Sequence, residues 1–260
     1  MLGKKMRRCL TSLLVISSLV LWAPLALALA ETIESSAKYV YHNNKTYAGV
    51  SKLTGYYQTE VSAQTWAGVS GGQTTPVSTL RAKARLYDGI DALYRESGWV
   101  TNTETTQVMA RTTLVPNPYG SWRSQGQFGV YTASNNFWND YNCYTTDWWP
   151  YAPSAKSGNV QEESQKQPYK VNKNGQTYGS GLDAISPDDE PDLILAMGVD
   201  GVTVGYVYSK DLDGEDPTSE KECLEMTKKS LAGFTIPLYD VDGETVIGEF
   251  QVGGSDGKIQ

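Results

Sequence analysis

Histidine is nearly absent from this chain, and that scarcity limits the catalytic chemistry open to it. Among 260 residues there is one histidine, His42, which stands beside Asn43 and Asn44 in a pattern typical of a hairpin turn. General acid–base catalysis uses histidine most often, and the sequence contains no H-E-x-x-H, G-x-S-x-G or glycine-rich phosphate loop. We therefore expect a binding protein rather than an enzyme, with no catalytic residue, no metal site and no cofactor to assign.

Clusters of basic residues are also lacking beyond the first eight positions. The chain has 22 Lys and Arg against 29 Asp and Glu, a net charge of −7. Four of those basic residues precede Cys9, and without the first 30 residues 18 basic and 29 acidic side chains remain, a net charge of −11. Nucleic-acid binding needs clustered cations to neutralise phosphates, so we exclude nucleic acid as a partner.

Long apolar runs are absent after residue 30, and the one that precedes it indicates export. A basic segment through Arg8 is followed by an apolar run to Leu29, and Ala28 and Ala30 form an A-x-A cleavage pattern. We expect residues 1–30 to be a signal peptide that is cleaved after Ala30. The alternative is an uncleaved membrane anchor, because about 20 apolar residues can span a bilayer. Cleavage predicts a secreted, extracellular protein with no membrane span.

Cysteine is scarce as well. The chain has three, and loss of Cys9 with the signal peptide would leave Cys143 and Cys223. In an oxidising compartment these two could form one disulfide, for which loop-closure entropy predicts a stabilisation of about 4 kcal/mol. The alternative is two separately buried thiols.

Charge and tryptophan are distributed unevenly along the chain. Residues 31–155 have nine acidic and nine basic side chains, whereas residues 156–260 have 20 acidic and nine basic ones. All arginines and tryptophans after residue 30 lie in the first of these segments. Such a shift is typical of a domain boundary. We predict a first domain over 31–155, an exposed linker over 156–168 and an acidic second domain over 169–260.

The first half has the period-two alternation of half-buried strands. Leu80, Ala82, Ala84 and Leu86 alternate with Arg81, Lys83 and Arg85, which predicts one apolar face and one solvated face. Asp88-Gly89 then predicts a hairpin turn. Similar alternation follows around Val108 and Phe128, with no helical period between them. The expected fold is an antiparallel β-sandwich or meander.

The second half has a mixed pattern. Two apolar runs flank Val199-Asp200-Gly201, and two more flank Asp242-Gly243, so each pair predicts a hairpin. Between them, Cys223, Met226, Thr227 and Ser230 or Leu231 have helical spacing. Ser219 or Thr218 could cap this helix, and Glu222 stands three residues after Ser219, as in a capping box. The expected fold is therefore mainly β overall, with a small α+β domain in the order hairpin, helix, hairpin.

Aromatic residues are concentrated between Phe137 and Tyr151, and this segment is the candidate ligand-binding site. Aromatic faces stack on sugar rings or on a partner's side chains. The alternative is that these rings pack in the core, which we expect for Trp66, Trp99 and Trp122. The candidate ligand-binding residues are Trp138, Tyr141, Tyr144, Trp148 and Trp149.

The acidic residues leave two alternatives open. Asp211, Asp213, Glu215 and Glu222 occupy positions 1, 3, 5 and 12 of a calcium-binding loop, but position 6 is Asp216 rather than glycine. Solvated turns are the other interpretation of these acidic runs. A pair of carboxylates brought together from distant positions could also act as a glycosidase-type acid and base. These patterns give two alternative functions, a calcium-dependent adhesion module and an envelope-directed hydrolase.

Several segments resemble uncharacterised small exported proteins of Gram-positive, Firmicutes-type bacteria. The resemblance rests on the run from Thr79 to Tyr87, on Ser97-Gly98-Trp99-Val100 and, in the second half, on Gly205-Tyr206-Val207-Tyr208 and Ile236-Pro237-Leu238-Tyr239. It implies secretion and a two-part organisation and transfers no catalytic residue. We expect an exported protein that binds a cell-envelope glycan or a surface protein through an aromatic-rich surface.

Overall fold

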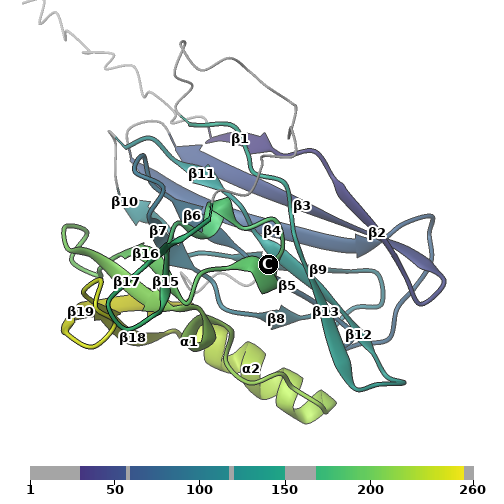
Figure 1. The fold of residues 1–260 in the computed structure, drawn as a ribbon. Helices are drawn as coiled ribbons and strands as arrows, with labels where there is room; N and C mark the ends of the chain where they lie inside the picture. Colours follow the sequence, from purple (N-terminus) through teal and green to yellow (C-terminus); the bar gives the residue numbers. More distant parts are fainter. Residues whose placement is uncertain (1–29, 57–58, 117–119, 150–167, 255–260) are drawn as a thin grey trace, which may run out of the picture.

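The fold is known from a computed structural model that describes residues 30–56, 59–116, 120–149 and 168–254. Antiparallel strands dominate it (Figure 1), which confirms the mainly-β class. The predicted signal peptide lies outside the described residues except for Ala30, and the predicted linker lies outside them except for Pro168. Within the described ranges, no helix is both long enough and apolar enough to cross a membrane.

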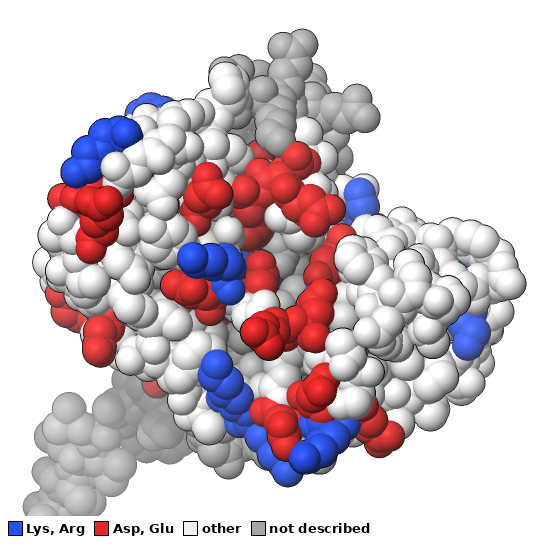
Figure 2. Space-filling model, turned by 60° about the horizontal axis from the view of Figure 1, so that its bottom comes forward, with Lys and Arg blue, Asp and Glu red and all other residues white. Residues whose placement is uncertain are grey.

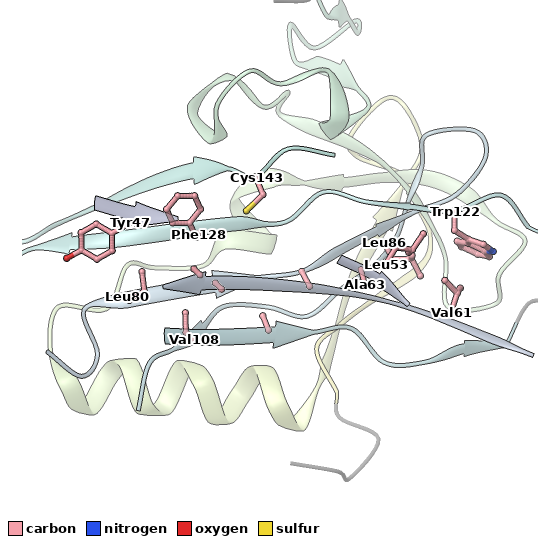
Figure 3. Packing of buried hydrophobic residues seen from close by; sticks show 14 of the residues in the cluster. Tyr47, Leu53, Val61, Ala63, Leu80, Leu86, Val108, Trp122, Phe128 and Cys143 are labelled. Atoms are coloured by element: carbon pink, nitrogen blue, oxygen red, sulfur yellow. The ribbon is translucent and has the colours of Figure 1, made fainter. Parts of the chain in front are cut away.

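Two antiparallel sheets pack face to face in the first half, as the alternation predicted. The first sheet contains β1 (Ala30–Glu34), β2 (Lys38–His42), β3 (Lys45–Tyr56), β4 (Glu60–Val69), β9 (Gln107–Arg111) and β10 (Val115–Pro116). The second sheet contains β5 (Leu80–Lys83), β8 (Val100–Thr101), β12 (Gln127–Thr132) and β13 (Phe137–Asn142). Leu53 and Val61 of the first sheet lie in one buried cluster with Leu80 and Phe128 of the second (Figure 3). This cluster is the core of a β-sandwich.

A third sheet contains strands from both halves of the chain. Its members are β6 (Arg85–Tyr87), β7 (Leu93–Glu96), β11 (Arg123–Ser124), β14 (Lys170–Val171), β15 (Thr177–Gly179), β16 (Leu193–Met197), β17 (Val204–Tyr208), β18 (Phe234–Tyr239) and β19 (Val246–Val252). Strand β7 pairs in parallel with β16 and with β19. The halves on either side of the predicted linker thus share a sheet, and their division into two domains stays a prediction.

The long alternating strand predicted from Leu80 to Leu86 is divided between two sheets. Strand β5 ends at Lys83 in the second sheet, and β6 begins at Arg85 in the third. At the break, Ala84 donates its N–H to Ser97 Oγ at 2.9 Å, and its carbonyl accepts from the Ser97 N–H at 3.0 Å. The predicted hairpin at Asp88 then joins β6 to β7. This change of sheet carries the alternating segment from the sandwich to the second half.

The second half has the predicted order of hairpin, helix and hairpin. Strands β16 and β17 pair, α1 (Ser209–Asp213) and α2 (Glu220–Ala232) follow, and β18 pairs with β19. Short 3₁₀ helices, η1 (Gly181–Asp183) and η2 (Pro187–Asp189), precede β16. The capping box is present, since Ser219 Oγ accepts from the Glu222 N–H at 3.3 Å and Glu222 accepts from the Thr218 N–H at 2.7 Å. Both caps satisfy backbone donors at the start of α2.

The two hairpins turn at segments with the same pattern, V-D-G-x-T. Asp200 accepts hydrogen bonds from the Val202 N–H and from both the N–H and the hydroxyl of Thr203. Asp242 does the same with Glu244 and Thr245. These donors favour the charged carboxylate, and they lower the pKa of each aspartate from 3.8 to about 2.

We predict that the two turns contribute to loss of stability in acid. A carboxylate whose pKa is lowered by folding stabilises the native state above its ordinary pKa, and that contribution is lost as the pH falls toward 2. The double variant Asp200→Asn/Asp242→Asn should therefore lose less of its free energy of unfolding than the wild type between pH 4.5 and pH 2. Urea unfolding at several pH values measures this difference. Glu104→Gln, at an exposed position outside the turns, should keep the wild-type slope, and equal slopes for all three proteins would contradict the prediction.

Candidate functional site

The three basic residues of the alternating segment are buried, which corrects the prediction of a solvated face. The side chains of Arg81, Lys83 and Arg85 are 2%, 0% and 1% exposed. They lie on the side of the strands that faces away from the sandwich core, and residues of both halves cover them. The alternation identified the two faces correctly, but the second face is covered by protein rather than by water.

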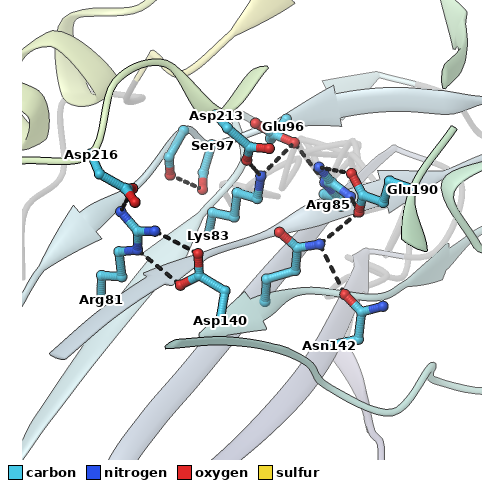
Figure 4. Close-up of polar contacts among 12 residues, drawn as sticks. Arg81, Lys83, Arg85, Glu96, Ser97, Asp140, Asn142, Glu190, Asp213 and Asp216 are labelled. Carbon is cyan, nitrogen blue, oxygen red and sulfur yellow. Dashed lines mark hydrogen bonds and ion pairs between the residues drawn. The ribbon is translucent and has the colours of Figure 1, made fainter. Parts of the chain in front are cut away.

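Arg81 is held between two indole rings and two carboxylates. Its guanidinium carbon lies 4.3 Å from the ring centroid of Trp99 and 4.5 Å from that of Trp138. Asp140 accepts from Nε at 3.0 Å and from a terminal nitrogen at 2.5 Å, and Asp216 accepts from the other terminal nitrogen at 2.8 Å (Figure 4). Stacking and bidentate pairing both exploit the planar guanidinium. Because Asp216 precedes α2, Arg81 fastens that helix to the sandwich.

Lys83 and Arg85 continue the charged row toward the third sheet. Lys83 contacts Asp213 at the end of α1 and lies 3.8 Å from Glu96. Arg85 donates from Nε to Glu96 at 2.6 Å, and its two terminal nitrogens bind Glu190. Burial alone would lower the pKa of Arg85, but Glu190 and Glu96 raise it well above its ordinary value. The guanidinium therefore stays charged although it is enclosed by protein.

The charged network contains more acid than base. Five carboxylates surround three cations: Asp140, Glu96, Glu190, Asp213 and Asp216. Figure 2 shows Asp and Glu gathered around a hollow on the face turned forward from the bottom of Figure 1, where α1 and α2 lie. Each of these five carboxylates contacts an arginine or lysine, so the arrangement favours fastening the halves together over acid–base chemistry.

The predicted aromatic site residues lie in different places. Trp138 is buried against Arg81, and its indole N–H binds the Pro217 carbonyl at 2.9 Å. Trp149 is also buried, and its indole N–H binds Glu31 at 2.9 Å at the other end of the segment. These two rings are packed within the protein, as the alternative interpretation of the segment expected.

The other three predicted residues are half-buried. Tyr141 packs on Phe128 with ring centroids 5.4 Å apart. Lys38 lies 5.3 Å from the ring centroid of Tyr144, and the guanidinium of Arg123 lies 4.2 Å from that of Trp148. The faces used by those cations are therefore occupied within the chain. A ligand-binding role for these residues stays a prediction.

Trp138 and Tyr131 line a small pocket beside the start of α2. Their ring centroids are 5.2 Å apart, and the pocket has a volume of about 140 Å³. That volume is close to the roughly 150 Å³ of a cavity that holds benzene and is below the usual range of ligand pockets. The pocket has room for a single ring or side chain.

A second group of apolar and aromatic residues lies on the solvent side of the first sheet. We call this group the outer platform, and it consists of three aromatic residues, Tyr39, Tyr41 and Trp66, together with Met109. Tyr39 and Tyr41 of β2 are 64% and 72% exposed, and Met109 of β9 is 52% exposed. Trp66 of β4 pairs with Met109 in register and is half-buried. The structure thus corrects the expectation that Trp66 belongs to the core, whereas Trp99 and Trp122 are buried as predicted.

Small residues and one amide hold the Trp66 ring against the sheet. A Cβ added at Gly68 would lie 2.5 Å from the indole, so the ring covers this glycine. The indole N–H donates to Gln107 Oε1 at 2.8 Å. Gly68 of β4 is paired in register with Ala48 of β3, and Ala48 is paired with Tyr39 of β2. Two small buried residues, Gly68 and Ala48, therefore separate Trp66 and Tyr39 along the register, and the indole covers Gly68. The K-Y-V-Y-H alternation of β2 was the sequence signal that could have revealed this surface.

The remaining sequence candidates do not converge on a site. His42 ends β2 at the predicted hairpin, where Asn43 and Asn44 have positive φ, and its ring binds the Thr132 hydroxyl at 2.5 Å. Cys143 and Cys223 are buried and free, in keeping with the separate-thiol alternative, and burial raises the pKa of Cys143 to about 12. No group of three or more His, Cys, Asp or Glu residues in the described part of the chain is placed to hold a metal ion.

Comparisons with known proteins do not assign the chain to a family. No protein-family model matches it, and neither the curated proteins nor the solved structures contain a significant match.

Proposed function

We propose that this is an exported, non-catalytic protein that binds a cell-envelope glycan through the outer platform. The observation that carries the proposal is the exposure of Tyr39 and Tyr41 beside the oriented ring of Trp66. Exposed contiguous aromatic surface is typical of recognition sites. Export is supported by the signal-peptide pattern of residues 1–30.

The chemistry of the platform favours a sugar over a protein partner. The C–H face of a pyranose stacks on aromatic rings, and its hydroxyls need amide or hydroxyl partners. Gln107 supplies an exposed amide on the same face as Trp66, and Thr46 supplies a hydroxyl beside Tyr41. Neighbouring strands lie about 5 Å apart, so a surface from β2 to β9 spans about 15 Å. This extent suits a few sugar units, whereas a stable protein interface buries about 800 Å² on each side.

We predict that Trp66→Ala weakens glycan binding about five- to thirtyfold, because loss of one well-placed aromatic contact removes about 1–2 kcal/mol. Gly68→Ala should have a similar effect without removing a ring, because the new Cβ would displace the indole. Co-sedimentation of the purified protein with insoluble envelope polysaccharide measures the affinity. Circular dichroism checks that each variant is folded.

Phe137→Ala is the matched control, since Phe137 is 53% exposed on β13 of the second sheet, away from the platform. It should bind as the wild type does. If Trp66→Ala binds as tightly as Phe137→Ala, the outer platform is not the site. If Trp148→Ala alone abolishes binding, the aromatic segment around residues 137–149 is the site instead.

A further inference from the structure

The charges around the outer platform differ from those of the chain as a whole. The cations on this face are Lys52 of β3 and Arg111 of β9, which lie in register with Gln64 of β4. Lys52 is paired with Glu34 at 2.8 Å. Arg111 has no ion pair among the described residues. In a chain with a net charge of −7, this face therefore presents an uncompensated positive charge beside its rings.

Carboxylates on the same face are paired or distant. Glu34 is engaged by Lys52. Glu60 lies at the start of β4, four residues from Gln64, which corresponds to about 13 Å along a strand. Arg111 consequently has no carboxylate of the sheet within contact distance, so an anionic group brought by a ligand would meet no competitor from this face.

The guanidinium of Arg111 is oriented by a neutral group. With the Gln64 amide turned so that its oxygen faces Arg111, that oxygen accepts from Nε at 3.0 Å and also from a terminal nitrogen. A neutral amide fixes the direction of the side chain and leaves its charge uncompensated. Arg111 directly follows the buried Ala110 and is two residues from Met109, so its side chain leaves the sheet on the side of Trp66.

We propose that the ligand is an acidic polysaccharide, one whose sugars carry carboxylate or phosphate substituents. Its rings stack on Trp66 and Tyr39, and one substituent binds the guanidinium of Arg111. The guanidinium fork matches the paired oxygens of both anions. This inference rests on the proposed function, because it requires the outer platform to bind sugars.

The overall charge of the protein makes this contact decisive. The net charge is −7 for the whole chain and −11 without residues 1–30, and both values oppose the approach of a polyanion, so general electrostatic attraction cannot substitute for Arg111. Loss of one charge-assisted contact is expected to weaken binding about tenfold. A neutral polymer with the same backbone has no charge to pair with Arg111, so its affinity should not change when Arg111 is replaced.

The test compares matched polymers by isothermal titration with the protein purified after export. One pair is a polyuronic acid and the same polymer with its carboxylates reduced to alcohols. The other is a glycerol-phosphate-substituted glycan before and after removal of the phosphate. We expect Arg111→Gln to weaken binding of a charged polymer about tenfold and to leave its neutral counterpart unchanged. Lys52→Gln is the control, because Lys52 lies on the same face but is already paired with Glu34.

Each outcome separates this inference from the proposed function. If the wild type binds charged and neutral polymers equally, or if Arg111→Gln has no effect while Trp66→Ala does, the platform binds glycans but the acidic class is wrong. If neither variant changes binding, both proposals are wrong. If phosphatidylglycerol vesicles bind in an Arg111-dependent manner and no polysaccharide does, the ligand is a membrane surface and both proposals fail.

Discussion

Replacing Arg85 by methionine should lower the free energy of unfolding by about 3–5 kcal/mol, the cost of breaking a buried ion pair by removing one partner. The side chains of Glu96 and Glu190 are 0% and 4% exposed, and Arg85 binds both. Methionine fills similar volume without charge, so the two carboxylates would remain in the interior without their main counter-ion. Urea unfolding followed by tryptophan fluorescence measures the change.

Two further variants separate charge from packing. Lys52→Met removes an ion pair whose side chains are 26% and 52% exposed, and it should cost at most about 1 kcal/mol. The triple variant Arg85→Met/Glu96→Gln/Glu190→Gln removes the carboxylate charges together with the guanidinium and should recover much of the loss. If Arg85→Met costs no more than Lys52→Met, the buried network does not hold the halves together. If the triple variant recovers none of the lost stability, the destabilisation by Arg85→Met comes from lost packing and not from unpaired buried carboxylates.

The ion pairs of the buried network also explain part of the charge asymmetry along the sequence. The acidic excess after residue 155 predicted a boundary, and the neutral count before it suggested an independent domain. In the structure, Glu190, Asp213 and Asp216 of the acidic half contact the three basic residues of β5 and β6. Part of the asymmetry therefore reflects complementarity between the halves. Composition records the charges of each segment but not the pairs that they form.

Local patterns predicted the elements well, because hairpins, caps and strand faces depend on nearby residues. The V-D-G turns, the cap at Ser219 and the apolar side of β5 are all determined within a few positions. What covers the other side of β5 could not be predicted, because Asp213 lies 130 residues away from Lys83. Alternation distinguishes two faces of a strand and does not say whether the polar one meets water or other protein groups.

The candidate site was harder to predict than the fold for a related reason. A dense run of aromatic residues between positions 137 and 151 directed the prediction to one segment, whereas the outer platform combines residues from β2, β4 and β9. Tyr39 and Trp66 lie 27 positions apart and come close only through the register of β3. A high density of aromatic residues in one segment of the sequence indicates neither that their side chains are exposed nor that they form one site. Both properties depend on how the strands pair in the fold.

Gly126 is the glycine for which added volume should be most damaging. It lies between β11 of the third sheet and β12 of the second, and its N–H binds Ser51 Oγ of β3 in the first sheet at 3.0 Å. A Cβ at this position would lie 1.6 Å from Thr65 Oγ1 and 2.7 Å from the Lys83 carbonyl oxygen. The carbonyl belongs to β5 and cannot move without disturbing the charged row. Gly126→Ala should therefore destabilise the protein by about 3 kcal/mol or more, at the upper end for overpacking.

Comparison with two variants tests the cause. Gly89→Ala is the matched control, because its Cβ would have no neighbour closer than 3.6 Å and its backbone does not require glycine. It should change the free energy of unfolding by less than about 1 kcal/mol. The double variant Gly126→Ala/Thr65→Ala removes the closer contact and leaves the carbonyl contact, so it should recover part of the loss. Equal stability of Gly126→Ala and Gly89→Ala would show that the strands around Gly126 can move apart without cost, which contradicts close packing of the sandwich there.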